Sequence, residues 1–417
     1  MGKIFVQIAS YRDPELRPTL KDLFEKADKP DNLKVCVAWQ HSSDDKWDTL
    51  DEYVNDERVN ILDIPYSESE GACWARNLIQ QQYRGEKYTL QLDSHHRFIQ
   101  GWDTELIKML KGLQDKGFKK PLLTSYACSY DPESDPKGRI TTPWRMDFDR
   151  FSPEGVLHTR PSSIDNWKEL EHPVPARFYS AHFAFTLGKF CREVPHDPEL
   201  YFHGEEPSIA VRAFTHGYDL FHPHRCILWH EYTREGKKKN WDDYKNWGNR
   251  DKRSHKRFRE LLGSGTERIE DYGKYGLGIA RPLEMWEQYA GVRFKDRSAQ
   301  QYTYDRNDPP NPAYDSSEEY DKSFKLKFKH YIDIHKSSLP EDDYEFWVIA
   351  FEKEDGTPIH RADADSKEVK RLLRRSGDFV NILREYAGEP PYQWVVWPYS
   401  TSKKWCDRIV KVIDYEG

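Results

Sequence analysis

The sequence has few cysteines and no long apolar run, and each absence excludes a class of protein. Its six cysteines are scattered over 417 residues without a C-x-x-C pair or zinc-finger spacing, which predicts free thiols in a cytoplasmic protein. No segment approaches the roughly 18 apolar residues of a membrane-spanning helix. Residues 1–6 lack the pattern of a signal peptide and of a myristoylation site. We therefore expect a cytoplasmic protein with no membrane span.

An excess of charge of one sign is also missing. The chain carries 64 Lys and Arg against 71 Asp and Glu, a net charge of −7, which argues against a nucleic-acid partner. Any site that binds phosphate must therefore depend on a local group of basic residues rather than on the net charge of the chain. Aromatic residues make up 14% of the chain, enough to build a core and to exclude a disordered protein.

Three catalytic motifs are absent as well. The sequence contains no H-E-x-x-H, no G-x-S-x-G and no Walker A segment, which argues against a zinc peptidase, a serine hydrolase and a P-loop enzyme. The glycine-rich segment 272–278 follows no strand and does not fit a dinucleotide fingerprint.

The first hundred residues alternate between strand and helix patterns. Continuous apolar runs predict buried strands, and apolar residues at helical spacing predict helices at 16–27 and 71–83. The strands are expected at residues 4–9, 33–39, 59–64 and 88–92. This alternation is typical of an α/β protein with helices on both faces of a sheet, in which ligands bind beyond the carboxyl ends of the strands.

The remaining chain predicts two parts joined by a linker. Further strands are expected at 122–126 and 182–187, with a long irregular connection at 130–177. Residues 304–320 are rich in Pro, Asn and Asp and predict a linker between residues 1–303 and a small α+β domain at 321–417. That domain is expected to contain a helix over 366–386, and oligomerisation through it is a possible role.

The strongest candidate for chemistry is Asp93-Ser94-His95 at the end of a predicted strand. Residues i and i+2 of a strand point to the same side, so the carboxylate and the imidazole can reach one cation. An oxygen and nitrogen ligand set of this kind suits Mn²⁺ or Mg²⁺. His230 ends another apolar strand and is the preferred third ligand, with His222 and His224 as nearby alternatives.

Other polar residues fall near the same strand ends or at helix starts. Ser10, Tyr11 and Arg12 follow the first strand and could pin a base, and Arg76 offers a planar donor for phosphate. Glu205 and Glu206 begin a helix. They either stabilise the helix N-terminus through its dipole or orient a sugar or an acceptor hydroxyl. The basic segment 234–257, which includes Arg234 and Arg253, is either a solvated face or a lid over a diphosphate.

Several segments taken together resemble a known enzyme family. The segments 8–15, 71–77, 92–98, 204–206 and 253–278 are similar to the GlcNAc-transferase family that includes the cytoplasmic hydroxyproline-polypeptide N-acetylglucosaminyltransferases. The resemblance covers residues 3–300 and implies a GT-A-type mixed sheet, a UDP-sugar donor, most simply UDP-GlcNAc, a divalent metal and retention of anomeric configuration. The metal motif is also similar to that of the polypeptide GalNAc-transferases, which implies Asp93, His95 and His230 as ligands.

The sequence therefore predicts a metal-dependent retaining glycosyltransferase. We expect Mn²⁺, or Mg²⁺, on the UDP diphosphate, with Ser10, Tyr11, Arg12, Arg76, Asp93, Ser94, Arg234 and Arg253 at the nucleotide sugar and Glu205 or Glu206 as the catalytic carboxylate. The acceptor would be a hydroxyl group of a protein or a glycan. A binding protein for nucleotide sugars or glycans, without catalysis, is the alternative. A metal-dependent phosphohydrolase ranks lower because the site offers one aspartate with histidines rather than several carboxylates.

Overall fold

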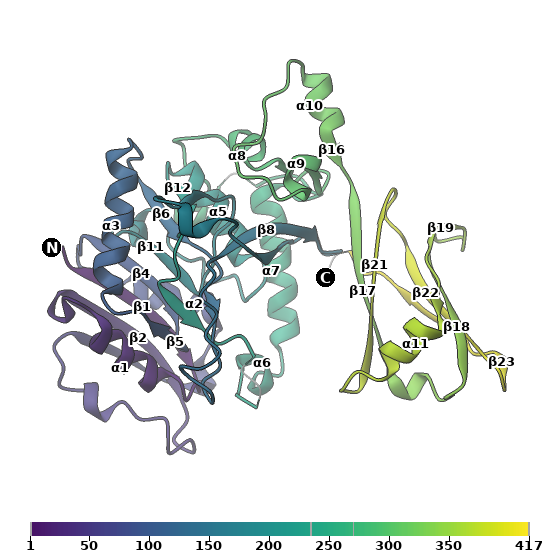
Figure 1. Cartoon of the computed structure of the whole chain (residues 1–417), viewed down its shortest axis with the longest axis horizontal. Coiled ribbons are helices and arrows are strands. Elements are labelled where there is room, and N and C mark those ends of the chain that lie inside the picture. The colour runs from purple at the N-terminus through teal and green to yellow at the C-terminus, as the bar shows by residue number, and fades with distance from the viewer. Residues whose placement is uncertain (1, 234–235, 270, 416–417) are drawn as a thin grey trace.

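The computed structural model describes residues 2–233, 236–269 and 271–415. Its largest sheet, which we call the central sheet, is mixed, has eight strands and lies within the larger, N-terminal part of the chain (Figure 1). Four parallel strands occupy one side of this sheet, and β11 joins them to the rest by running antiparallel to both of its neighbours. The strand order is β10 (Val174–Pro175), β12 (Asp219–His222), β6 (Pro121–Thr124), β11 (Phe183–Leu187), β4 (Tyr88–Asp93), β1 (Ile4–Tyr11), β2 (Leu33–His41) and β3 (Val59–Pro65). The predicted α/β class is confirmed.

Helices cover both faces of the sheet because its central strands are apolar on both sides. In β1, Val6 and Ile8 belong to a core shared with α1 (Leu16–Lys26) and α3 (Trp102–Asp115), whereas Phe5 faces α2 (Ala72–Gln80) on the opposite side. A further core joins β6 and β12 to α5 (Glu205–Thr215). The helices expected at 16–27 and 71–83 are confirmed.

A second, three-stranded sheet extends the carboxyl edge of the large one. It consists of β5 (His96–Phe98), β13 (Leu228–His230) and β7 (Cys128–Ser129), with β13 in the middle. β13 runs antiparallel to β5, and His230 pairs with His96. Because of this register, His230 lies beside the segment that directly follows Asp93.

The expectation of an irregular connection over residues 130–177 was wrong. This stretch contains the antiparallel hairpin of β8 (Trp144–Phe151) and β9 (Leu157–Ser163). The hairpin is stable because Met146, Phe148 and Leu157 are buried in a core with α7 (Trp247–Leu262) and α8 (Leu283–Ala290). Its polar outer residues hid this alternation from the sequence pattern.

The predicted linker packs against the large part of the protein. Between α9 (Gln301–Tyr304) and α10 (Ser317–Ser323), the buried side chain of Asn311 accepts a hydrogen bond from Arg177 Nη2 at 2.6 Å. Asn311 also donates to Gln300 Oε1 and Thr303 Oγ1. Short strands flank this region, namely β14 (Val292–Arg293), β15 (Ser298–Gln300) and β16 (Phe324–Lys325). The domain boundaries at 303 and 321 stay a prediction.

The C-terminal part has its own core and lies to one side of the central sheet (Figure 1). The predicted helix over 366–386 was wrong, because α11 (Ser366–Leu373) ends early and Phe379–Ala387 forms strand β21. Val380 and Ile382 are buried, with exposed residues between them, so the period is two rather than helical. The other elements are β17 (Lys327–His335), β18 (Tyr344–Glu352), β19 (Pro358–Arg361), β20 (Ala364–Asp365), β22 (Gln393–Ser400), β23 (Lys404–Trp405) and β24 (Ile409–Val412).

The sequence predicts neither disulfide bonds nor a membrane-spanning helix, and the structure can be compared with both expectations over the described residues. The cysteines all lie in the described ranges, and each is a free thiol. Within those same ranges, the helices are too short or too polar to cross a lipid bilayer.

Candidate active site

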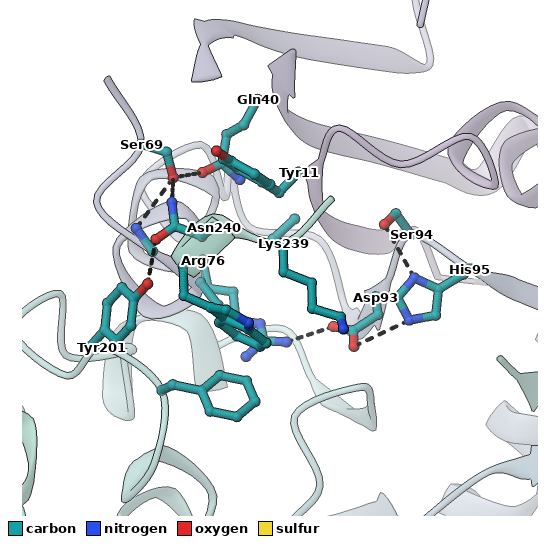
Figure 2. Close-up of a pocket in the computed structure, with 15 residues that line it drawn as sticks. Tyr11, Gln40, Ser69, Arg76, Asp93, Ser94, His95, Tyr201, Lys239 and Asn240 are labelled. Carbon is teal, nitrogen blue, oxygen red and sulfur yellow. Dashed lines mark hydrogen bonds and ion pairs between the residues drawn. The ribbon is translucent and has the colours of Figure 1, made fainter. Parts of the chain in front are cut away.

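The candidate site lies at the carboxyl edge of the central sheet, where β2 and β4 flank β1. Asp93 is the last residue of β4 and pairs with Ala9 of β1. A cavity of about 140 Å³ opens beside it (Figure 2). Its lining includes Tyr11, Gln40, Ser69, Arg76, Asp93, Ser94, His95, Tyr201, Lys239, Asn240 and Trp241. Open α/β sheets bind their ligands at this kind of edge, where the strand order reverses.

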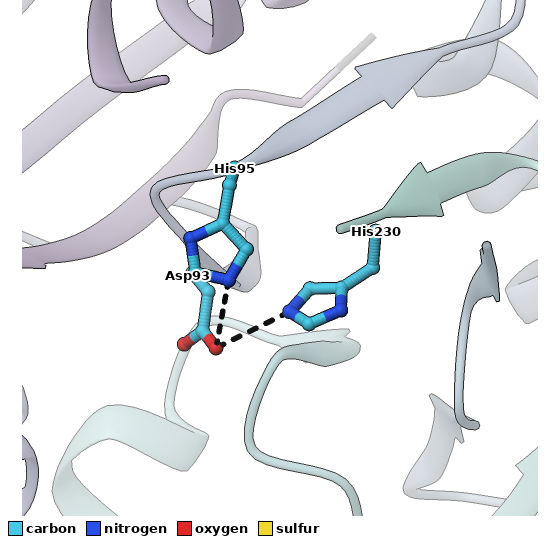
Figure 3. A group of neighbouring side chains, drawn as sticks. All are labelled: Asp93, His95 and His230. Atoms are coloured by element: carbon cyan, nitrogen blue, oxygen red, sulfur yellow. Dashed lines mark ion pairs between the residues drawn. The ribbon is translucent and has the colours of Figure 1, made fainter. Parts of the chain in front are cut away.

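Asp93, His95 and His230 converge at this edge. The Oδ2 atom of Asp93 lies 3.9 Å from Nε2 of His95 and 3.5 Å from Nε2 of His230 (Figure 3). Both imidazole rings are buried, and their centroids are 4.6 Å apart. The structure thus brings together the three residues that the sequence predicted as metal ligands. His222 instead bonds to the Thr124 carbonyl oxygen, away from the cluster.

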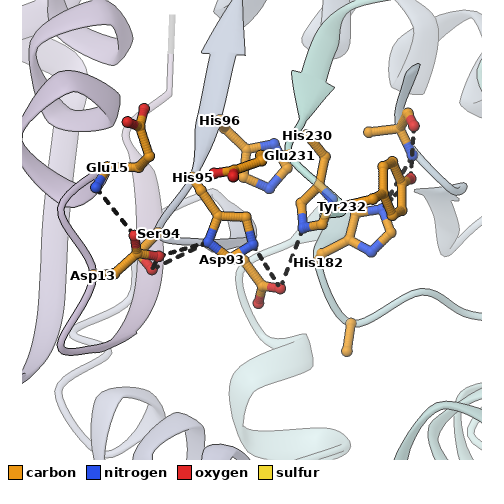
Figure 4. A network of polar contacts seen from close by, with 12 residues as sticks. Asp13, Glu15, Asp93, Ser94, His95, His96, His182, His230, Glu231 and Tyr232 are labelled. Carbon is orange, nitrogen blue, oxygen red and sulfur yellow. Dashed lines mark hydrogen bonds and ion pairs between the residues drawn. The ribbon is translucent and has the colours of Figure 1, made fainter. Parts of the chain in front are cut away.

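Asp13 orients the imidazole of His95. Its Oδ2 atom lies 2.7 Å from Nδ1 of His95 and accepts a hydrogen bond from Ser94 Oγ at 2.6 Å (Figure 4). A carboxylate at Nδ1 places the proton there and leaves the Nε2 lone pair directed toward Asp93. This arrangement of carboxylate, histidine and open ring nitrogen is typical of metal sites.

His230 is buried with both ring nitrogens lacking a hydrogen-bond partner among the described residues. Its ring stacks on that of His182 at 4.2 Å. Burial lowers the pKa of His230 to about 3, so the ring is neutral and its lone pair is available. Because an unpartnered buried nitrogen costs free energy, and because this one faces a carboxylate, the cluster fits a divalent cation.

Asp93, His95 and His230 are called the metal-type cluster below, and Arg76 links this cluster to the start of α5. Its Nη2 atom lies 2.6 Å from Oδ1 of Asp93, and its Nη1 atom lies 2.6 and 2.7 Å from the two carboxylate oxygens of Glu205. Burial alone would raise the pKa of Asp93, but the charge of Arg76 holds it well below its usual value. Asp93 therefore stays ionised with one oxygen facing the histidines. The structure gives Arg76 carboxylate partners in place of the expected phosphate.

The two glutamates of α5 have different environments. Glu205 is buried against Arg76 and His196, and these charges outweigh the effect of burial and lower its pKa to about 2. Glu206 accepts hydrogen bonds from the Ala181 N–H group at 2.8 Å and from Ser180 Oγ at 3.3 Å. Burial raises its pKa to about 7. Both line a second cavity of about 310 Å³ that also reaches Asp93.

Part of the predicted basic lid docks on the end of β1. The Tyr11 hydroxyl and Arg12 Nη1 both donate to Asp243 Oδ2, each at 2.9 Å, and Arg12 also pairs with Asp45. These contacts hold Lys239, Asn240 and Trp241 over the cavity. The structure thus gives Arg12 two aspartates as partners rather than an opening toward a nucleotide.

Of the other residues predicted to contact the nucleotide, some line the cavity and others do not. Ser94 lines the cavity, whereas Ser10 is buried beneath it and its backbone oxygen accepts from Gln40. Arg253 is exposed on α7 and is not among the residues that line the cavity. Arg234 lies outside the described residues.

Sequence reasoning missed several residues that shape the site. Asp13 and Asp243 orient His95 and Tyr11, and His182 packs on His230. A signal was present for Asp13, which follows the end of the first strand as Asp93 ends the fourth. Nothing in the sequence pattern indicated Asp243, because its partners lie more than 200 positions away in the chain.

The family model described as Glycosyltransferase (GlcNAc) matches residues 3–55 and 48–296, which include every residue of this site. The chain belongs to the GlcNAc glycosyltransferase family. This membership makes it a glycosyltransferase, and its mixed sheet agrees with the GT-A-type fold expected from the resemblance. A search of curated proteins found no match.

A comparison with solved structures found glycosyltransferases at low similarity. GalNAc-T7 with UDP, GalNAc and Mn²⁺ is 12% identical, with a TM-score of 0.49 over 100% of this chain and 72% of that one. S. aureus TarS 1–349 with UDP-GlcNAc is 13% identical, with a TM-score of 0.37 over 58% and 61%. The mannosyltransferase PcManGT from Pyrobaculum calidifontis with GDP-Man and Mn²⁺ is 12% identical, with a TM-score of 0.37 over 57% and 59%. At such values, the family assignment rests on the sequence match alone.

Proposed function

We propose that this protein is a metal-dependent retaining glycosyltransferase that moves GlcNAc from UDP-GlcNAc to a hydroxyl group of a protein or glycan. The observation that carries the proposal is the convergence of Asp93, His95 and His230 beside a cavity at the sheet's carboxyl edge. A divalent ion there, Mn²⁺ in preference to Mg²⁺ because two ligands are imidazoles, would neutralise charge on the departing diphosphate.

The residues around the cluster have distinct proposed roles. Arg76 is a positioning residue, because it keeps Asp93 ionised and holds it in place through its contact with Glu205. Asp13 does the same for His95. Tyr11 and the segment containing Lys239 and Trp241 enclose the nucleotide, since all three residues line the cavity.

Glu206 is the carboxylate that we place at the acceptor. Glu205 is ion-paired and buried, whereas Glu206 faces the second cavity with a pKa of about 7. A carboxylate with a pKa near the working pH is suited to hold the proton of an attacking hydroxyl group. Acceptor binding in the second cavity would bring that hydroxyl close to the donor site, because Asp93 lines both cavities.

Two features outside the site belong to the proposal. The free cysteines favour a cytoplasmic location. The C-terminal part, with its own core, is proposed as an accessory domain that recruits the acceptor or pairs subunits.

A donor screen with the full chain tests the proposal. The protein is incubated with UDP-GlcNAc and Mn²⁺, and both UDP release and sugar transfer to peptide or glycan acceptors are measured. We expect Asp93→Asn and His95→Ala to lose at least about 100-fold in rate, since each removes a ligand. His224→Gln serves as the matched control, because His224 is a buried histidine outside the cluster.

Two outcomes would contradict the proposal. Full UDP release by both folded ligand variants would remove the role of the cluster. Tight binding of UDP with Mn²⁺, without hydrolysis or transfer to any acceptor, would favour the non-catalytic binding protein.

A further inference from the structure

A second group of metal-type side chains lies outside the candidate active site. His203, Asp251 and His255 each offer a ligand atom, and these atoms lie within 4.8 Å of one another. Asp251 and His255 are one turn apart on α7 and therefore share a face of that helix. His255 Nε2 lies 3.5 Å from Asp251 Oδ2. His203 reaches them from the segment that precedes α5.

Two polar atoms of this group are buried without a partner. Asp251 Oδ1 and His255 Nδ1 accept and donate no hydrogen bond within the described residues. The side chain of His255 is also nearly enclosed, since the residue is 8% exposed. Buried polar atoms are nearly always satisfied in folded proteins, because an unsatisfied one costs free energy. Two such atoms in one group of three side chains point to a ligand at this group.

The third side chain is held near the other two by its backbone. Ser254, between the two α7 residues, donates to the His203 carbonyl oxygen at 3.0 Å and accepts from the Tyr201 N–H group at 3.1 Å. The His203 residue is exposed, and its ring lies 6.1 Å from that of His255. Ligand atoms of a tetrahedral zinc site lie about 3.3 Å apart when the bonds are 2.0–2.1 Å. His255 Nε2 and Asp251 Oδ2, at 3.5 Å, are near this spacing, and the ligand atoms of all three residues lie within 4.8 Å of one another.

The surroundings do not oppose a cation. The cluster borders a cavity of about 420 Å³ between the β8–β9 hairpin and the C-terminal part. Arg150, Lys329 and Lys411 line this cavity, but Arg150 and Lys329 are ion-paired with Asp149, and the lining also includes the carboxylates of Glu154 and Asp414. The ring of His158 lies 5.3 Å from that of His203 on the side of the β8–β9 hairpin.

We propose that His203, Asp251 and His255 form a second metal site that takes Zn²⁺. Two imidazoles and one carboxylate are a donor set that suits zinc better than Mg²⁺ or Ca²⁺, which prefer oxygen ligands. His203 is followed by Gly204 and by Glu205, which holds Arg76. An ion at this site would therefore tie α7 to the segment that enters the candidate active site.

Zinc titration of the full chain tests this site separately from the first one. The protein is stripped with a chelator, and Zn²⁺ binding is measured in His95→Gln, where the first cluster lacks a ligand. We expect His95→Gln to retain one equivalent of tightly bound Zn²⁺ and the double variant with His203→Gln to lose it. His203 is exposed, so its substitution should not disturb folding. His172→Gln in the same background is the control, because His172 is an exposed histidine in neither cluster.

A second readout uses the otherwise unmodified chain. Added Zn²⁺ should raise the thermal unfolding midpoint of the wild type more than that of His203→Gln or Asp251→Asn, while the midpoints of wild type and His203→Gln agree in chelator. The proposal is overturned if the double variant binds Zn²⁺ as tightly as His95→Gln, or if His95→Gln binds none. Both results are independent of whether the protein transfers a sugar.

Discussion

The contact between Asp13 and His95 gives the sharpest test of the metal-type cluster. Asp13 has a fully buried side chain, and its Oδ2 atom lies 2.7 Å from His95 Nδ1. Asp13→Asn keeps an oxygen that can accept from Nδ1 but removes the charge, whereas Asp13→Ala removes the acceptor altogether. In both variants the three direct ligand candidates remain unchanged.

The expected loss follows from the role of such outer partners. Removing a carboxylate that orients a metal-bound histidine typically lowers metal affinity by about 10–100-fold, which corresponds to about 1.4–2.8 kcal/mol. We expect Asp13→Asn near the lower end and Asp13→Ala near the upper end, since only the alanine leaves the imidazole free to turn. Loss of the buried acceptor should also lower the free energy of unfolding by about 1–3 kcal/mol.

Mn²⁺ affinity is measured by calorimetry or by electron paramagnetic resonance at fixed pH, and folding is followed by urea unfolding. Asp103→Asn is the matched control, because Asp103 is a buried aspartate that accepts from the backbone N–H groups of Asp28 and Lys29, away from the cluster. It should lose stability without losing Mn²⁺ affinity. Wild-type Mn²⁺ affinity in folded Asp13→Ala would refute the reasoning, as would an equal loss of affinity in Asp103→Asn.

Three further predictions address the neighbouring residues. Because the folded pKa of Glu206 is about 7, above its usual value of 4.5, its contribution to the free energy of unfolding should fall as the pH rises from about 4.5 through 7. Urea unfolding at pH 5 and pH 8 should show this fall in the wild type but not in Glu206→Gln, and parallel curves would contradict it. Arg76→Met leaves the carboxylates of Asp93 and Glu205 without their cation and should cost about 3–5 kcal/mol in urea unfolding, with a smaller loss for Arg76→Lys; a loss below 1 kcal/mol would argue against the bridge. Asp243→Ala removes the acceptor of the Tyr11 hydroxyl and of Arg12 Nη1 and should raise KM for the nucleotide sugar about 10-fold with little change in kcat, and an unchanged KM would remove the docking role.

The strands of the large sheet and the candidate residues of the metal-type cluster were predictable from local patterns. Continuous apolar runs identified the strands, because a strand buried on both faces has few polar residues. The same reasoning located Asp93 and His95, since a strand's period of two places both on one side of its end. The prediction of one helix over 366–386 was wrong because part of this segment pairs with a distant strand. The pairing of β21 with β17 overrode the local helix propensity.

The partners of these residues depended on the tertiary structure. The sequence favoured His230 over His222 and His224 because it ends an apolar strand, and the antiparallel register of β13 against β5 is what brings it to the cluster. The two carboxylates on Arg76 come from β4 and α5, the latter 129 positions away. The sequence alone thus determined which strand ends carry chemical groups, because strand periodicity is local. Only the folded chain decided which of those groups meet, because contacts between distant segments depend on strand order and register, which a local pattern does not encode.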